Sequence, residues 1–396
     1  MRIDSIDLRL IPDSRGNNTL EATMHSGNLV EVASVPSGKS TGATEVVVLD
    51  PMEAVEKLEQ IKPEILSGEY ESVEQLDEML LKLDGTPNKA ALGGNLILAL
   101  SIAFTKLLAR SQNLEPFSLV AQIAGTKPEK LPWCFYNLIE GGVHAENSLP
   151  FQEYLFVPTV NSPKKSLTMV MELLQLLADE IHAKYGQLKM GDEGGYTIPS
   201  SDPLEGLQVL KAMQEKAGQT DTKISLDVAA SALAKNGRYS LREWEIDLSD
   251  LWNLYKKIIH EYKILSIEDP FDEKDIENFI YITKELGDSA WIVADDLTTT
   301  SPRRVQEIGE KKAANAVIVK PNQIGSVSET IKAALLAKSF GWKIIVSHRS
   351  GETMDDFIAD LAVGLQADGL KSGCPLQKQR LIKYQRLIEI EKELQE

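Results

Sequence analysis

Four segments decide the fold of this chain: ILSIEDP (264–270), WIVADD (291–296), AVIVKPN (316–322) and IIVSHRS (344–350). Each is a short run of apolar, mostly β-branched residues that ends in polar ones, and helical periodicity fills the intervals. An earlier strand is expected over 224–226. Strands that alternate with helices over about 270 residues predict a (β/α)8-type barrel. A doubly wound open sheet is the alternative, weakened because the chain lacks a Gly-x-Gly-x-x-Gly or phosphate-loop motif.

The residues before this repeat follow a different pattern. Segments 3–11, 19–24 and 30–35 alternate apolar with polar residues or carry β-branched ones, and turn compositions separate them. Helical periodicity follows over 51–66, 73–83 and 95–110. We therefore expect a smaller α+β domain at 1–125, with a three-stranded sheet plus helices. It would cap a barrel domain at 126–396 that carries the active site.

Composition excludes several classes of function. The 396 residues include 42 Lys and Arg against 59 Asp and Glu, a net charge of −17 that disfavours general nucleic-acid binding. The longest apolar run, 96–104, is interrupted by Ser101 and is too short to span a bilayer. The start, MRID, has no apolar export segment, and Cys134 and Cys374 form no disulfide framework. We expect a cytoplasmic protein without a membrane span.

Polar residues close the expected strands one after another. Since the carboxyl ends of barrel strands carry the catalytic groups, these residues predict a site at one end of the barrel. A single charged strand end is unremarkable because strand ends meet solvent, but six in succession are not. In chain order they are Asp227, Glu268, Asp295, Lys320, the Ser347-His348-Arg349-Ser350 stretch and Lys371.

The carboxylates among them predict a metal ion. Asp227, Glu268 and Asp295 would end neighbouring strands, where three anions repel one another unless a cation lies between them. All-oxygen ligation favours Mg²⁺ over Zn²⁺. The alternative is an ion-pair network with lysines. Lys320 and Lys371 are the available pair, and a lysine acts as a general base only when its pKa is lowered.

Other candidates carry weaker signals. Of five histidines, His144 follows a glycine pair after a strand and His348 precedes Arg349, whose forked guanidinium suits phosphate. Gln152 and Glu153 open a strand. Glu193 lies in the Gly191–Gly195 loop, which by itself is weak evidence.

Taken together, these motifs resemble the enolase family over essentially the whole chain. The matching stretches occur in order through both expected domains, and the SHRSGE string is the most specific of them. They are DSRGN (13–17), PSGKSTG (36–42), GGVHA (141–145), QEY (152–154), GDEGG (191–195), EDPF (268–271), ADDLT (294–298), KPNQIG (320–325) and SHRSGET (347–353).

The resemblance implies a lyase of glycolysis and gluconeogenesis. It would reversibly dehydrate 2-phosphoglycerate to phosphoenolpyruvate with two Mg²⁺ per active site. Asp227, Glu268 and Asp295 would hold the first Mg²⁺, and Ser40 the second. Lys320 would remove the carbon-2 proton. The other implied roles are Glu193 as the acid on the 3-hydroxyl with Glu153 beside it, His144 and Lys371 as further catalytic groups, Gln152, His348, Lys371 and Ser40 as substrate contacts, and Arg349 and Ser350 as phosphate contacts.

Several positions depart from the family pattern while leaving the implied metal and acid–base residues in place. The chain passes from Asp50 directly into a helix, where the family usually has a longer loop. Glu140 stands where Asn is usual, Glu146 where Gly is usual and Ala232 where Glu is familiar. Gln377 stands near a frequent arginine that we associate with subunit contacts. The family implies a homodimer or higher homo-oligomer, and these changes bear on loop closure and assembly.

Two other functions compete with this one. A superfamily member acting on another α-acidic carboxylate would be expected to lose the Arg349–Ser350 pair or Glu193, and neither is lost. An enolase-fold scaffold or binding protein with altered or no turnover is the second. The Leu394-Gln395-Glu396 end lacks the terminal lysine proposed for plasminogen binding. The sequence does not decide a scaffold role in an RNA-degrading complex.

Overall fold

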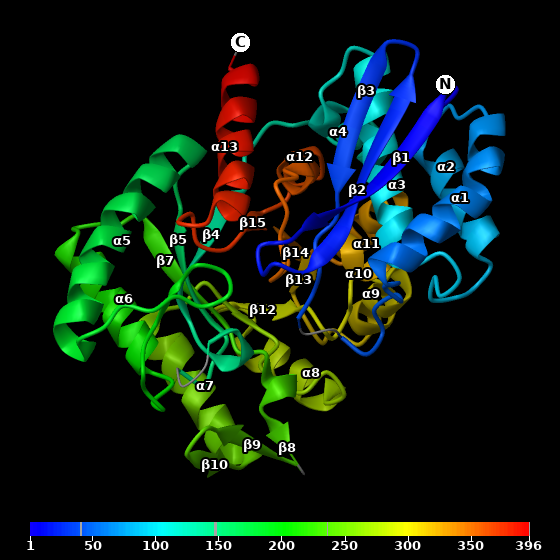
Figure 1. Ribbon diagram of the computed structural model, residues 1–396. Coiled ribbons are helices and arrows are strands. Elements are labelled where there is room, and N and C mark those ends of the chain that lie inside the picture. The colour runs from blue at the N-terminus through cyan, green and yellow to red at the C-terminus, as the bar shows by residue number, and fades with distance from the viewer. Residues whose placement is uncertain (40–41, 146–148, 236, 396) are drawn as a thin grey trace.

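The N-terminal part of the chain is a small α+β unit, as expected (Figure 1). The computed structural model describes residues 1–39, 42–145, 149–235 and 237–395. Within them, an antiparallel three-stranded sheet runs in the order β1 (Ser5–Pro12), β2 (Asn18–Ser26) and β3 (Leu29–Ser34). The helices that follow are α1 (Pro51–Ser67), α2 (Val73–Asp84), α3 (Gly94–Ser111) and α4 (Pro116–Ala124).

Two of these helices show how the local sequence sets their boundaries and burial. Asp50 caps α1 by accepting a hydrogen bond from the Met52 N–H at 2.9 Å, and Pro51 occupies the first turn, so the helix begins without an intervening loop. In the described part of the chain, α3 alone is long and apolar enough to cross a membrane. Since 83% of it is buried inside the fold, it is a core helix.

The C-terminal part is a closed barrel. In the described residues eight strands form it, and β15 pairs with β4 to close the ring, which excludes the open-sheet alternative. Strand β5 runs antiparallel to both of its neighbours, whereas the other pairings are parallel. The barrel strands are β4 (Trp133–Glu140), β5 (Glu153–Pro158), β7 (Thr222–Asp227), β11 (Ser266–Glu268), β12 (Trp291–Ala294), β13 (Ala316–Val319), β14 (Lys343–Ser347) and β15 (Gly369–Lys371).

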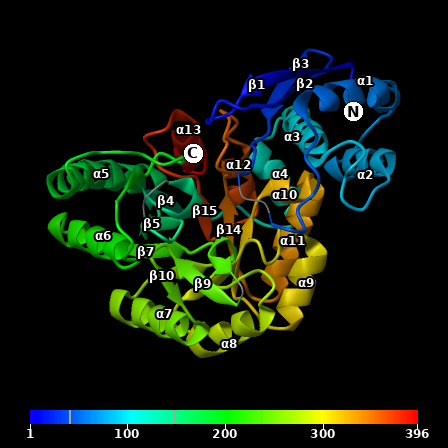
Figure 2. The same cartoon turned by 60° about the horizontal axis from the view of Figure 1, so that its bottom comes forward.

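Helices surround the strands on the outside (Figure 2). They are α5 (Pro163–Tyr185), α6 (Glu205–Lys216), α7 (Leu248–Tyr262), α8 (Ile276–Leu286), α9 (Pro302–Glu310), α11 (Val327–Ser339), α12 (Phe357–Gly364) and α13 (Lys378–Glu393). The short α10 (Pro321–Ile324) follows β13, and β6 (Tyr196–Thr197) flanks β4. A small antiparallel sheet of three strands follows β7, namely β8 (Ala234–Lys235), β9 (Arg238–Leu241) and β10 (Trp244–Ile246).

The inside of the barrel is packed. Apolar side chains from five strands form a cluster separate from the main core, namely Phe135, Leu155, Val157, Val293, Ala316, Ile318 and Ile345. A filled lumen leaves space for a ligand only at the ends of the barrel, where the polar strand ends lie.

Strand register brings charged residues of neighbouring strands to one level. Asp227 lies opposite Glu268 of β11 on one side and Glu153 of β5 on the other. Because β5 is antiparallel, its first residue, Glu153, lies where the parallel strands end. On the far side of the ring Ser347 pairs with Lys371. The barrel end therefore gathers side chains that are far apart in sequence.

A buried aspartate links the two parts of the molecule. Asp77 of α2 is fully buried, and its Oδ2 accepts a hydrogen bond from the Ser328 N–H of α11 at 2.9 Å. Burial raises the pKa of Asp77 to about 6, in spite of hydrogen bonds from Ser101 and Ser328 that lower it. The ordinary pKa of an unfolded Asp is about 3.9. Native Asp77 therefore binds its proton more tightly than unfolded Asp77.

This shift predicts a pH dependence of stability. The stabilising contribution of protonated Asp77 is complete below about pH 4 and is lost as the pH rises through about 6. Asp77→Asn should remove this loss and so gain about 1.4 kcal/mol relative to the wild type between pH 5 and pH 7.5, since the native pKa lies about one unit above pH 5. Unfolding midpoints at the two pH values measure it. Asp84→Asn is the matched control, because the pKa of Asp84 lies below its usual range in spite of burial, through hydrogen bonds from Thr86 and Leu92. Equal pH slopes for the wild type and Asp77→Asn would contradict the prediction.

Candidate active site

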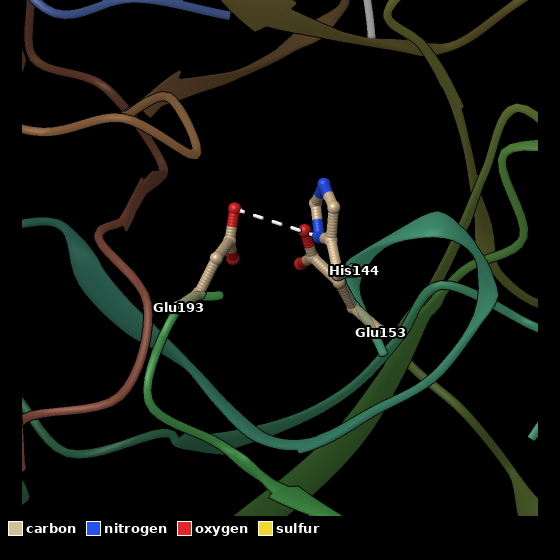
Figure 3. Close-up of side chains that lie close together, drawn as sticks. All are labelled: His144, Glu153 and Glu193. Atoms are coloured by element: carbon tan, nitrogen blue, oxygen red, sulfur yellow. Dashed lines mark ion pairs between the residues drawn. The ribbon is translucent and has the colours of Figure 1, made fainter. Parts of the chain in front are cut away.

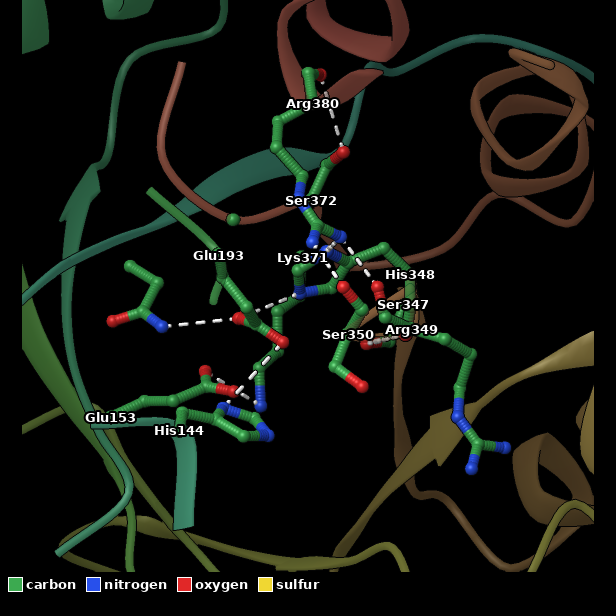
Figure 4. Close-up of polar contacts among 12 residues, drawn as sticks. His144, Glu153, Glu193, Ser347, His348, Arg349, Ser350, Lys371, Ser372 and Arg380 are labelled. Atoms are coloured by element: carbon green, nitrogen blue, oxygen red, sulfur yellow. Dashed lines mark hydrogen bonds and ion pairs between the residues drawn. The ribbon is translucent and has the colours of Figure 1, made fainter. Parts of the chain in front are cut away.

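A cavity of about 240 Å³ opens where the barrel strands end. Most of the side chains that line it are polar or charged, and they come from several strand ends and loops (Figure 4). Among the predicted site residues the lining includes His144, Gln152, Glu153, Glu193, Asp227, Asp295, Lys320, His348, Arg349, Ser350 and Lys371. These residues, which are far apart in sequence, line one cavity at this end of the barrel.

Lys371, the last residue of β15, lies among three carboxylates. Its Nζ is 2.8 Å from Oε2 of Glu268, 3.1 Å from Oδ2 of Asp227 and 3.0 Å from Oε2 of Glu153. Burial lowers the pKa of Lys371, but these carboxylates raise it well above its usual value. Burial raises the pKa of Glu268, and the charge of Asp227 raises it further. Lys371 is therefore a fixed cation in this site.

Lys320 makes a second such pair. It follows β13, and its Nζ donates a very short hydrogen bond to Oδ2 of Asp295, which follows β12. Burial lowers the pKa of Lys320, yet Asp295 raises it above the usual value. The ion-pair network considered as the alternative to a metal site is therefore present in this structure. Lys320 and Lys371 pair with the carboxylates that were expected to hold a metal ion.

Glu193 is surrounded by hydrogen-bond donors. Its Oε2 lies 3.2 Å from Nε2 of His348 and accepts a bond of 3.1 Å from Nδ2 of Asn137. Its Oε1 lies 3.7 Å from Nδ1 of His144, and Glu153 lies beside this pair (Figure 3). Burial raises the pKa of Glu193, but the hydrogen bond with His348 and the nearby charge of Arg380 hold it well below its usual value. Glu193 is therefore ionised among these partners.

Arg380 fixes the protonation of His348. This buried arginine of α13 contacts Nδ1 of His348 through Nη1 at 2.6 Å (Figure 4). A guanidinium has no acceptor, so Nδ1 must present its lone pair and the proton of neutral His348 must be on Nε2, which faces Glu193. Burial lowers the pKa of His348 to about 4, in agreement with a neutral ring. Arg380 also donates to the carbonyl oxygens of Arg349 and Ser350, which holds the SHRS stretch in place.

Arg349 and Ser350 form a corner suited to an anion. Nη1 of Arg349 donates to Oε2 of Glu45 at 2.9 Å and to Oδ1 of Asn322 at 3.1 Å, and Nη2 donates to Oε1 of Glu45 at 3.2 Å. Glu45 thus holds the guanidinium with both oxygens, as a phosphate would. Among the described residues, the buried Oγ of Ser350 has no hydrogen-bond partner. A phosphate bound here would take the place of the Glu45 carboxylate.

The carboxylates also suit a cation. In the described residues, two groups have ligand atoms within 4.8 Å of one another: Asp269 with Asp295 and Asp296, and His144 with Glu153 and Glu193. Asp227 and Glu268 converge on Lys371 instead, and among the described residues Glu268 is not part of the cavity lining. Oε1 of Glu268 and Oε1 of Gln152 are buried and have no hydrogen-bond partner within the part of the chain that the structure describes. Orphaned buried oxygens next to other carboxylates fit a hard divalent cation.

Four further residues singled out in the sequence remain to be located, and two of them are not among the described residues. Ser40 and Glu146 are outside the described residues. Ala232 lines the cavity. Gln377, expected near subunit contacts, donates from Nε2 to the carbonyl oxygen of Asp192 at 3.1 Å within the chain.

Sequence reasoning missed Arg380, Asn137 and Glu45. Arg380 belongs to a charged helix whose pattern indicates solvent exposure. No local signal marks the other two. Only spatial proximity to His348, Glu193 and Arg349 identifies these three residues.

The closed barrel, the α+β unit before it and the cavity of paired acids and lysines define a class of protein. They describe a two-domain barrel enzyme with acid–base groups at the barrel mouth and carboxylates compatible with a metal ion. Residues 3–120 match the family model "Enolase, N-terminal domain", and residues 128–396 match "Enolase, C-terminal TIM barrel domain". The chain belongs to the enolase family.

Curated relatives agree with the family models. Proteins named Enolase from three organisms are similar over nearly their whole length. The one from Pyrococcus furiosus is 42% identical over 98% of this chain and 94% of its own. That from Thermococcus kodakarensis is 40% identical, and that from Solanum lycopersicum 41%, each over 99% of this chain and 95% of its own.

Proposed function

We propose that this chain catalyses the reversible dehydration of 2-phosphoglycerate to phosphoenolpyruvate, as a Mg²⁺-dependent lyase of glycolysis and gluconeogenesis. One observation carries the proposal: a candidate base, Lys320, and a candidate acid, Glu193, line one cavity from separate segments, with an anion-binding corner beside them. Family membership supports the reaction. The residue roles and the identity of the metal are our proposal.

The difficult step is removal of the proton from carbon 2, because it places a second negative charge on the substrate carboxylate. Bound Mg²⁺ supplies positive charge that stabilises this developing charge. Asp227, Glu268, Asp295 and Ser40 are the proposed ligands, and Lys371 adds a fixed positive charge. Lys320 accepts the proton in its neutral form. The Asp295 charge that now raises the pKa of Lys320 must therefore be offset by another cation.

Departure of the 3-hydroxyl needs a proton donor, which we assign to Glu193. The carboxylate is ionised here, and the negative charge of a substrate beside it raises its pKa so that it binds a proton. Glu153 lies beside it, and burial raises the pKa of Glu153 well above its usual value. His144 and Gln152 line the same cavity. Arg349 and Ser350 would bind the substrate phosphate once Glu45 is displaced.

The direct test follows phosphoenolpyruvate by its absorbance. The purified chain with 2-phosphoglycerate should form it in the presence of Mg²⁺, and a chelator should stop the reaction. Activity that persists without any divalent cation would contradict the metal assignment. A complete lack of activity under all conditions would favour the alternative function, an enolase-fold scaffold or binding protein. Family membership alone does not favour that alternative.

Assembly and location complete the proposal. We propose that each chain has two domains, 1–125 and 126–396, and that two chains form a homodimer. The dimer would work in the cytoplasm on a small-molecule substrate, without general nucleic-acid binding. Light scattering at micromolar concentration should give twice the chain mass of 43.8 kDa. A single 43.8 kDa species would contradict the dimer.

A further inference from the structure

Glu140 is a buried acid behind the site that the proposed chemistry does not use. It is the last residue of β4, lies opposite Glu153 in the sheet register and has no exposed surface. It stands where the family resemblance leads one to expect an asparagine. Its neighbour in space is the Gly191–Gly195 loop, which carries Glu193.

The Glu140 carboxyl group binds the backbone of this loop. Oε1 accepts a hydrogen bond of 2.5 Å from the Gly195 N–H and one of 3.2 Å from the Glu193 N–H. Oε2 accepts another from the Glu193 N–H at 3.1 Å. A single side chain therefore binds the backbone of Glu193 directly and that of Gly195 beyond it.

The loop is shaped to receive this side chain. A Cβ atom at Gly191 would lie 2.3 Å from Oε2 of Glu140, and one at Gly195 would lie 3.0 Å from Oε1. Real Cβ atoms do not approach an oxygen at the first distance, so glycine at 191 is needed for the carboxyl group to fit. An asparagine at 140 is one methylene shorter and would not extend as far into this space.

The opposite face of the loop is held as well. Nε2 of Gln377 donates to the Asp192 carbonyl at 3.1 Å, and the Asp192 N–H donates to the His144 carbonyl at 3.1 Å. A Cβ at Gly194 would lie 2.8 Å from Cγ of Gln377. The segment that carries Glu193 is thus clamped between β4 and the start of α13.

We propose that Glu140 is a positioning residue for Glu193. By accepting the N–H groups of Glu193 and Gly195, it sets where the Glu193 carboxyl group meets His348 and the cavity. Glu140 does not line the cavity itself, so it acts through Glu193 and not on the substrate. The inference rests on the proposed function, because it assigns Glu140 to the step that Glu193 performs.

The test separates two half-reactions. Exchange of the carbon-2 proton with solvent needs Lys320, and dehydration needs Glu193 as well. Glu140→Ala should lower kcat for dehydration on the order of 10²-fold, the effect of displacing a catalytic group by about 1 Å. Exchange should stay within roughly threefold of the wild type, and KM should change little. A merely structural defect would lower both rates together.

Two further variants sharpen the comparison. Glu140→Gln keeps a carbonyl oxygen of the same reach and should restore most of the dehydration rate. Burial and the nearby Glu193 raise the pKa of Glu140, so a neutral amide is a close substitute. Asp84→Ala is the matched control, since Asp84 accepts the N–H groups of Ala91 and Leu92 in the other domain. It should leave the ratio of exchange to dehydration unchanged.

Each outcome decides the inference. Equal losses of exchange and dehydration in folded Glu140→Ala, or no loss of dehydration, would overturn it. Glu140→Gln as impaired as Glu140→Ala would overturn its hydrogen-bonding basis. If Glu140→Ala does not unfold cooperatively, Glu140→Ser, which is polar but too short to reach the Gly195 N–H, takes its place with the same expected result. A wild-type chain that neither exchanges nor dehydrates would refute the proposed function instead.

Discussion

Lys320→Ala should abolish both exchange of the carbon-2 proton with solvent and formation of phosphoenolpyruvate. Lys320 is the proposed base, and no later step can proceed when the proton stays on carbon 2. The loss should be at least the roughly 10²–10⁴-fold typical of a positioned acid or base. Exchange into labelled water, followed by nuclear magnetic resonance, measures the first rate, and absorbance measures the second.

Glu193→Gln provides the contrast. Glutamine fills the same space and still accepts from Asn137 and His348, but it donates no acidic proton to the leaving hydroxyl. Dehydration should fall by a similar factor while part of the exchange survives. Exchange that survives in Lys320→Ala and vanishes in Glu193→Gln would mean that the two roles are reversed. Equal loss of exchange in both would contradict a role of Glu193 confined to the hydroxyl.

The second large effect concerns the cation. Asp295→Asn should remove high-affinity Mg²⁺ binding and turnover together, because an amide replaces one charged ligand of a proposed set of three carboxylates. Calorimetric titration with Mg²⁺ in the absence of substrate isolates binding from catalysis. This separation matters because Asp295 also pairs with Lys320, so the substitution changes the base as well.

A distant carboxylate serves as the control for this experiment. Asp360 of α12 is buried and pairs with Arg386 of α13 at 2.8 Å, away from the cavity lining. Asp360→Asn should leave Mg²⁺ affinity unchanged. Unchanged Mg²⁺ affinity in Asp295→Asn would count against Asp295 as a ligand and would leave its ion pair with Lys320 as its main role.

The strands, their polar ends and the kind of fold can be predicted from the amino-acid sequence. An apolar run such as 316–319 predicts a buried strand. Lys320 follows this run directly and is therefore expected at the end of the barrel. This inference works because side-chain periodicity and strand ends are local properties, set by neighbours along the chain. By this reasoning the sequence alone assigns Asp227, Glu268, Asp295, Lys320 and Lys371 to the barrel mouth.

Which of these groups contact one another depends on how the strands pair in the folded barrel. The hydrogen bonds between β15 and β4 close the ring, and the antiparallel direction of β5 brings Glu153 to the level of Asp227. Pairing across strands depends on register, and no local pattern records it. The sequence therefore left open whether these carboxylates contact a lysine or a metal ion. In the folded chain Lys320 and Lys371 are both paired with carboxylates.

The same limit applies to the residues behind the site. Arg380 belongs to a helix of charged appearance, yet it is buried against His348 and fixes the position of its proton. Glu45 holds Arg349 from the other domain, and Glu140 holds the loop of Glu193 from the end of β4. The two partners in these three contacts are separated in sequence by 32, 304 and 53 positions, respectively. The sequence specifies the chemical groups, but folding over such separations decides their partners, because long-range packing and burial are properties of the whole molecule.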